Sequence, residues 1–273
     1  MIMRYSLFLP IQLALASVLF AAPAAFAQSP SAKLILSEDF ESTPVGEVPQ
    51  GFTKAGKVGV ADDAAHSGKK SLKMEAAVNG ARRITKQGPE IAALGGEHWG
   101  RLYYKVKLPA PLPVVPDGKK SAVIHSTLVS GIAKSPLFND MIEVRPFGSM
   151  IYPDGGVKYL YNVQPKNSRK EFATVTKTIS HYTDEWTLVE WHVDYATQTY
   201  QFFINGEEIP DMALHKGADK FEGAEIPALF DNLSFGWTNY QPAGEGFVSW
   251  IDDIALSKER IGPTPATPAA PKK

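Results

Sequence analysis

Cysteine is absent from the 273 residues, so no disulfide bond can hold the fold together. A chain of this length can bury a core large enough to be stable without one. A strong net charge is also lacking, because 28 Lys and Arg stand against 29 Asp and Glu. This balance gives no sign of a nucleic-acid partner or of attraction to an anionic membrane.

The motifs of several enzyme classes are missing as well. The sequence has no Walker or dinucleotide-binding glycine motif, no zinc-type His spacing and no internal repeat. The G-x-S-x-G elbow of serine hydrolases and the Glu-x-Asp-x-x-Glu pattern of jelly-roll glucanases are absent too. Nucleotide chemistry and serine hydrolysis are therefore disfavoured.

One long apolar run lies at the N-terminus. Arg4 precedes an apolar stretch from Leu7 to Phe20, and Ala25-Phe26-Ala27 stands before Gln28. This pattern predicts a signal peptide over residues 1–27, because the stretch is shorter than the ~18 residues typical of a membrane span. A retained anchor is the alternative. We expect export to the periplasm or beyond, with no membrane span after cleavage.

The 246 residues that follow read as one all-β domain over 28–262 and a disordered Pro/Ala-rich tail over 263–273. Alternation of apolar and polar residues over 100–108 and 233–238 is typical of strands with one buried face. Asn205-Gly206 follows the hairpin expected over 186–204 and marks a turn. We expect the domain to be a monomer.

The strand over 247–256 places Asp252 on one face with Trp250, Ile254 and Leu256. A carboxylate among apolar side chains is costly unless a cation or hydrogen-bond donors neutralise it. Glu41 and Ser67 lie in polar segments near the other end of the chain. The three residues are candidate ligands of a cation such as calcium, although each also suits a strand end or a solvated turn.

A second polar group falls on a hairpin with a turn at Pro153-Asp154-Gly155-Gly156. Glu143 and Arg145 share one strand face, and Tyr159 and Tyr161 share a face of the next strand, with Asn162 at its end. Aromatic rings stack on sugar rings, and Arg or Asn pairs with carboxylates or hydroxyls. The hairpin thus indicates a sugar-binding cleft or, alternatively, a solvated sheet face. His125 lies in a preceding apolar strand, where a satisfied core histidine is the alternative to a catalytic one.

Short motifs along the mature chain resemble a family of secreted fungal proteins that are co-expressed with cellulases. The family has a concanavalin A-like β-jelly roll, a two-sheet antiparallel sandwich similar to that of glucuronan and alginate lyases. The matching segments, in chain order, are Glu38–Glu41, Ala65–Ser71, Trp186–Pro210 with Glu190-Trp191-His192 and Asn205-Gly206, Phe235–Tyr240, Trp250–Asp253 and Arg260–Gly262.

The resemblance implies a structural calcium ion on Glu41, Ser67 and Asp252. It also implies a cleft, in which the following residues match family positions: His125, Arg145, Tyr161, Asn162, Trp237 and Tyr240. Glu143 stands where the family has a histidine, and Pro146-Phe147-Gly148 replaces its glycine-rich run.

These residues suit a polysaccharide lyase acting on an acidic, uronate-containing glycan. In β-elimination the uronate carboxylate must be neutralised, a base must remove the proton at C5 and an acid must protonate the leaving oxygen. Arg145 and Asn162 are the expected neutralisers, while His125 with Tyr161 or Tyr240 supplies base and acid. A non-catalytic carbohydrate-binding module is the first alternative and a glycoside hydrolase the second.

Overall fold

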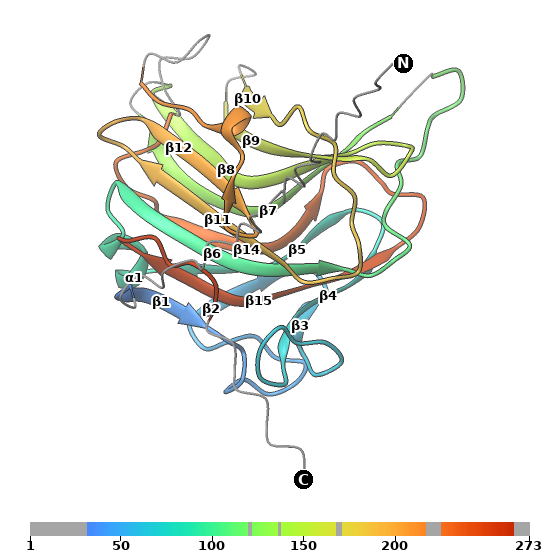
Figure 1. The fold of residues 1–273 in the computed structure, drawn as a ribbon, viewed down its shortest axis with the longest axis horizontal. Helices are drawn as coiled ribbons and strands as arrows, with labels where there is room; N and C mark the ends of the chain where they lie inside the picture. The colour runs from blue at the N-terminus through green and yellow to red at the C-terminus, as the bar shows by residue number, and fades with distance from the viewer. Residues whose placement is uncertain (1–31, 120–121, 136–137, 168–170, 217–224, 265–273) are drawn as a thin grey trace, which may run out of the picture.

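The structure, a computed structural model, describes residues 32–119, 122–135, 138–167, 171–216 and 225–264. Strands dominate these ranges and form two antiparallel sheets (Figure 1). Helical structure there is limited to helix α1 (Pro89–Ala93) and the 3₁₀ turn η1 (Pro210–Met212), and neither has the length to cross a bilayer. The all-β antiparallel sandwich expected from the sequence is therefore confirmed.

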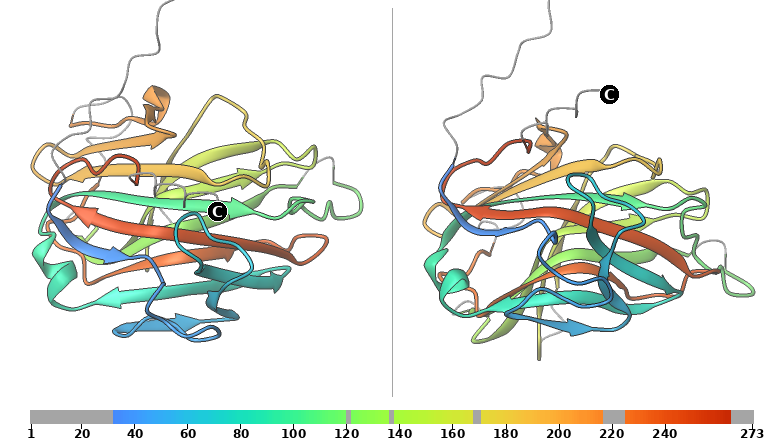
Figure 2. Two further views of the ribbon diagram at one scale, coloured as in Figure 1. Left: turned by 60° about the horizontal axis from the view of Figure 1, so that its bottom comes forward. Right: turned by 90° about the horizontal axis from the view of Figure 1, so that it is seen from below.

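The first sheet has eight strands. Its order is β13 (Glu207–Glu208), β12 (Thr199–Ile204), β11 (Thr187–Asp194), β6 (Glu97–Val106), β15 (Phe247–Ser257), β4 (Ser71–Ala77) and β3 (Val58–Ala61), and β1 (Leu34–Glu38) also pairs with β15. The first and last strands of the domain thus lie side by side (Figure 2).

The second sheet has seven strands. Its order is β10 (Phe172–Val175), β9 (Val157–Pro165), β8 (Asp140–Ile151), β7 (Ile124–Ser135), β14 (Asn232–Asn239), β5 (Gly80–Gln87) and β2 (Phe52–Ala55). About half of the neighbouring pairs join strands that are not consecutive in the sequence, so the sandwich depends on pairings that local patterns do not specify.

The core lies between the sheets and is rich in aromatic rings. Phe147 of β8 lies with its ring centroid 5.4 Å from that of Tyr104 on β6 and 5.4 Å from that of Phe202 on β12. Trp191 on β11 is fully buried above Gly100, where a Cβ would lie 2.0 Å from the indole. Glycine at position 100 is what allows that ring to pack onto β6.

Strand β15 contains a bulge at Asp252 and Asp253. Asp253 has a φ of 49°, and the register with β6 shifts between Asp252 and Ala255. Trp250 is buried on the opposite face of this sheet, where its indole N–H donates to Asp63 (2.9 Å), while Ile254 is fully buried in the core between the sheets. Trp250 and Asp252 share a face as expected, but the expectation that Ile254 and Leu256 share it too is wrong, because an extra residue after Asp252 reverses the alternation.

The C-terminal segment keeps contact with the first sheet for two residues beyond Gly262. The main-chain N–H of Thr264 donates to the Tyr103 hydroxyl (3.0 Å), and its side chain donates to Asp253 (3.2 Å). The start of the tail predicted at 263 is thus anchored. The predicted signal peptide and residues 265–273 lie outside the described residues.

Candidate functional site

The register of the β8–β9 hairpin decides which predicted residues meet on the outer face of the second sheet. Arg145 stands directly opposite Asn162, so their side chains share that face. Because side chains alternate along a strand, Tyr161 points the other way, into the core. The outer face carries a group of polar side chains that we call the outer patch, namely Arg83, His125, Thr127, Glu143, Arg145, Asn162 and Tyr240.

Arg145 is the centre of the outer patch. Its Nε and Nη2 atoms donate to one oxygen of Glu143 at 3.0 and 2.6 Å, and Nη1 donates to Asn162 Oδ1 at 2.9 Å. Asn162 in turn donates to Glu171, and Arg83 lies 3.5 Å from the second oxygen of Glu143. Such charge-assisted contacts hold the guanidinium plane in one orientation.

Tyr240 flanks the arginine. The guanidinium carbon of Arg145 lies 4.5 Å from the centre of the Tyr240 ring, and the phenol donates to the Thr127 hydroxyl at 3.3 Å. Burial and the nearby Glu143 raise the pKa of Tyr240, and Arg145 opposes them only in part. The phenol is therefore neutral at neutral pH, which suits a proton donor better than a base.

His125 is linked to Tyr240 of the outer patch by a main-chain hydrogen bond. The N–H of Tyr240 donates to the His125 carbonyl at 3.0 Å, which places the two residues side by side on β7 and the end of β14. Gln241 Oε1 accepts the His125 main-chain N–H at 2.7 Å and lies 3.2 Å from Nδ1. An amide oxygen can only accept, so this contact suits a hydrogen on Nδ1, and in that tautomer of the neutral imidazole Nε2 carries the lone pair.

Three predicted cleft residues are not on this face. Tyr159, Tyr161 and Trp237 all point into the core, with exposed fractions of 7%, 0% and 0%. Tyr159 hydrogen-bonds the Tyr104 hydroxyl, and Trp237 packs on Tyr182 and donates to Asn239. Burial also raises the pKa of Tyr161 well above its usual value. The expectation that these three side chains line the cleft is wrong, because strand alternation turns them inward.

Three residues at the outer patch were not predicted from the sequence, namely Arg83, Thr127 and Gln241. Arg83 comes from β5, which pairs with β14 far along the chain, and its guanidinium reaches the patch across β14 and β7. Gln241 follows directly after Tyr240, so its proximity to the patch was visible. Thr127 is two residues after His125 on β7, so its place on the same face could also have been predicted. Arg83 becomes visible only when strands distant in sequence are paired.

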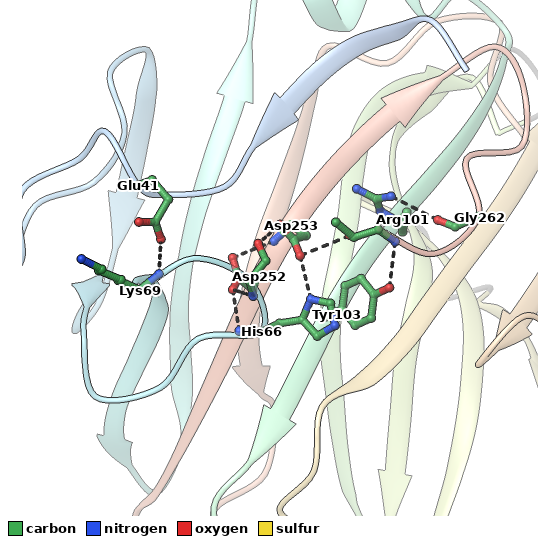
Figure 3. Close-up of polar contacts among 10 residues, drawn as sticks. Glu41, His66, Lys69, Arg101, Tyr103, Asp252, Asp253 and Gly262 are labelled. Carbon is green, nitrogen blue, oxygen red and sulfur yellow. Dashed lines mark hydrogen bonds and ion pairs between the residues drawn. The ribbon is translucent and has the colours of Figure 1, made fainter. Parts of the chain in front are cut away.

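Two of the predicted metal ligands flank the loop between β3 and β4, with Asp252 at the β15 bulge beside His66 and Glu41 beside Lys69 (Figure 3). Ser67, the third, belongs to that loop. Asp252 Oδ2 accepts the main-chain N–H groups of His66 and Ser67 at 2.8 and 3.3 Å, and Oδ1 accepts that of Asp253 at 2.8 Å. Burial, and next the charge of Asp253, raise the pKa of Asp252 to about 7. The Asp252 carboxylate is thus compensated by loop N–H groups.

Glu41 and Ser67 are engaged separately. Glu41 Oε1 accepts the main-chain N–H groups of Lys69 and Lys70 at 2.8 and 2.7 Å, and the Ser67 hydroxyl donates to Asp253 at 2.8 Å. The Lys70 ammonium donates to the carbonyl oxygens of Glu41 (3.0 Å) and Thr43 (2.9 Å). The positive charge beside the turn at Glu41–Thr43 is therefore the ammonium group of Lys70.

Calcium takes six to eight oxygen ligands. Loop 66–70 turns N–H donors rather than carbonyl oxygens toward Glu41 and Asp252. Among the described residues, no three His, Asp or Glu side chains are grouped so as to hold a metal ion. As placed, the three residues do not fit calcium, so this geometry does not support the ion that the resemblance implies.

No protein-family model matches the sequence, and no curated protein matches it. Among solved structures, the chain is similar to the cellulose-induced protein Cip1, with a TM-score of 0.52 and 19% identity over 84% of this chain and 100% of that one. This similarity supports the jelly-roll fold.

Two further similar structures are carbohydrate-related domains. One is domain 4 of AbnA, a GH43 extracellular arabinanase from Geobacillus stearothermophilus, in complex with arabinotriose (TM-score 0.47, 18% identity, 85% of this chain and 95% of that one). The other is the CBM22-1 xylan-binding domain of Xyn10C from Paenibacillus barcinonensis (TM-score 0.40, 11% identity, 86% and 99%).

Proposed function

We propose that the protein is exported and acts on an acidic, uronate-containing polysaccharide at the outer patch, cleaving it by β-elimination. One observation carries the proposal. Arg145 is hydrogen-bonded to Asn162 and stacked on Tyr240, whose main chain is bonded to His125. A neutralising cation, a base and an acid are therefore grouped on one sheet face.

Arg145 and Asn162 are assigned to the carboxylate of the substrate. A guanidinium has five N–H donors, and the hydrogen bonds to Glu143 and Asn162 use three of them. The other two N–H groups are available to a uronate carboxylate. Neutralising that carboxylate makes the adjacent C5 proton acidic enough to be removed.

His125 and Tyr240 are assigned to proton transfer. The Nε2 lone pair of His125 takes the C5 proton, and the electrons of that C–H bond form a C4–C5 double bond. The bond from C4 to the glycosidic oxygen breaks, and the Tyr240 hydroxyl donates its proton to that oxygen. The products are an unsaturated uronate and a new chain end, and transfer of the proton from His125 to Tyr240 through solvent restores both groups.

Binding without cleavage is the second candidate, and the Glu143–Arg145 ion pair favours it. A carboxylate that already holds the guanidinium competes with a substrate carboxylate, which lowers the catalytic benefit of the arginine. A glycoside hydrolase ranks third. It needs two carboxylates facing one sugar bond, whereas Glu143 and Glu171 are hydrogen-bonded to Arg145 and Asn162.

The test uses the mature protein with glucuronan, alginate, pectate and glucuronoxylan, and follows the ultraviolet absorbance of unsaturated uronates. We expect a rising signal on one polymer that Arg145→Ala and Tyr240→Phe abolish. Tyr195→Phe, at an exposed tyrosine after β11, is the matched control and should leave the signal unchanged.

Two other outcomes are informative. A flat signal on every polymer, with the protein retarded in a gel containing one of them, would establish binding without cleavage. If no polymer is cleaved and none retards the protein, or if both variants keep full activity, the outer patch is not a site for acidic glycans.

A further inference from the structure

A cavity of about 200 Å³ opens at one edge of the sandwich, between the two sheets. We call it the edge pocket. Its lining includes Tyr104, Val106, Tyr159, Ser180, Tyr182 and Ile204. Tyr159 faces inward from β9, so the second sheet separates the edge pocket from the outer patch.

The segment 176–187, which crosses from β10 to β11, forms the outer wall of the pocket. It is fixed to the second sheet by two main-chain hydrogen bonds between Ser180 and Val157, each 2.8 Å long. An ion pair between Lys105 and Asp184 (3.2 Å) fixes it to the first sheet. The wall of the pocket is therefore held to both sheets.

The interior carries hydroxyl groups but no charged side chain. The phenol oxygens of Tyr104 and Tyr159 lie 2.9 Å apart, and Tyr182 is 3.1 Å from the Ser149 hydroxyl. Burial raises the pKa of all three phenols, so they are neutral donors and acceptors. The only charged or titratable side chains other than tyrosines are His181 and Glu185, which are both exposed at the pocket.

Apolar surface completes the lining. Val106 and Ile204 present aliphatic groups, and the tyrosine rings add their faces and edges. A sugar ring has the matching combination of C–H faces and peripheral hydroxyls. The cavity is smaller than the ~300–1,000 Å³ of pockets for drug-sized ligands, so it has room for about one ring.

We propose that the edge pocket binds a single neutral monosaccharide unit. Hydroxyl groups of the sugar bond the Tyr104–Tyr159 pair and Ser180, and its C–H face packs on Val106 and Ile204. This site is separate from the outer patch and does not depend on the proposed function. It takes neutral sugars, whereas the outer patch is proposed to take uronates.

The test measures chemical shifts in the mature, isotope-labelled protein during titration with glucose, galactose, xylose, arabinose and glucuronate. Thr183→Trp places a large ring at an exposed lining position and should abolish saturable shifts. Thr178→Trp, at an exposed position of the same segment outside the lining, is the matched control and should bind as the unmodified protein does. Tyr159→Phe should weaken binding about fivefold, because one hydroxyl partner is lost.

Saturable shifts of pocket residues with a neutral sugar, lost in Thr183→Trp and kept in Thr178→Trp, are the expected result. The proposal is overturned if no neutral sugar gives saturable shifts up to tens of millimolar. It is equally overturned if Thr183→Trp binds normally or if glucuronate binds more tightly than every neutral sugar. A melting curve of each variant confirms that it is folded.

Discussion

The guanidinium of Arg145 lies over the ring of Tyr240, with 4.5 Å between the guanidinium carbon and the ring centre. The pair combines a cation with an aromatic surface on an otherwise polar sheet face. A planar guanidinium stacks and forms directed hydrogen bonds, which an ammonium does not reproduce. The pair also links β8 to the residue that follows β14, so it depends on the pairing of three strands.

Removing the charge of Glu143 should strengthen the binding of an acidic polymer to the outer patch. Glu143 holds Arg145 through two hydrogen bonds, so Glu143→Gln releases part of the guanidinium for an acidic ligand. We expect retardation in gels containing a polyuronate to increase severalfold. The same substitution should lower the pKa of Tyr240, which Glu143 raises, and a spectrophotometric titration of tyrosine measures that shift.

Glu75→Gln is the control for the Glu143 variant, because it makes the same change in net charge at an exposed position on β4 of the other sheet. Unchanged retardation in Glu143→Gln would show that Arg145 does not recognise the polymer. Equal effects of the two variants would attribute the gain to overall charge alone.

Trp237→Phe should reduce stability and leave glycan binding unchanged. The indole is fully buried and donates to Asn239 at 2.7 Å, so the smaller ring leaves a void and an unpaired acceptor site. We expect a loss of about 1–3 kcal/mol in the free energy of unfolding. Urea denaturation measures it. Weaker polymer binding with unaltered stability would contradict the core position of this residue.

His98 should make the protein acid-sensitive. It is fully buried beside Trp191, whose indole N–H donates to Nε2 at 3.2 Å, and burial lowers its pKa to about 3. A histidine with a depressed folded pKa stabilises the fold above its unfolded pKa of about 6.5, and this stability is lost as pH falls toward 3. When the pH falls from about 7 to about 5, His98 alone should lower the free energy of unfolding by about 2 kcal/mol.

His98→Gln should flatten this pH dependence, because glutamine keeps an acceptor for Trp191 and does not titrate. His215→Gln, at an exposed histidine, should keep the slope of the unmodified protein. Urea unfolding at about pH 7 and pH 5 measures the slope for the unmodified protein and for both variants. A slope that is the same in His98→Gln and in the unmodified protein would mean that other groups cause the acid sensitivity.

Calcium and Lys70 are tested by thermal unfolding. The loop N–H groups already satisfy Glu41 and Asp252, so we expect the melting temperature in calcium and in a chelator to agree within about 1 °C. Lys70→Met should lower the free energy of unfolding by about 1–2 kcal/mol, because two carbonyl oxygens lose the ammonium group that donates to them.

Lys69→Met is the control for Lys70→Met, since its side chain is exposed next to the same loop. A melting temperature that rises with calcium, and does so less in Asp252→Asn, would confirm the calcium site implied by the resemblance. Equal stability losses in the two lysine variants would show that the ammonium of Lys70 has no special role.

Local patterns determined the strands and hairpins of this protein. Alternation along 233–238 and 100–108 marked β14 and β6, and Asn205-Gly206, both with positive φ, formed the turn that the sequence indicated. These features depend on neighbours within a few residues, and their physical causes are therefore visible in a single stretch of sequence.

Tertiary structure decided which side chains meet. One extra residue at the β15 bulge reversed the faces around Asp252, and the β8–β9 register brought Asn162 rather than Tyr161 opposite Arg145. Since a shift of one residue moves a side chain to the other face of a sheet, pairing decides the composition of each face. Pairing between strands distant in sequence also brought Arg83 toward Glu143, which no local pattern could reveal.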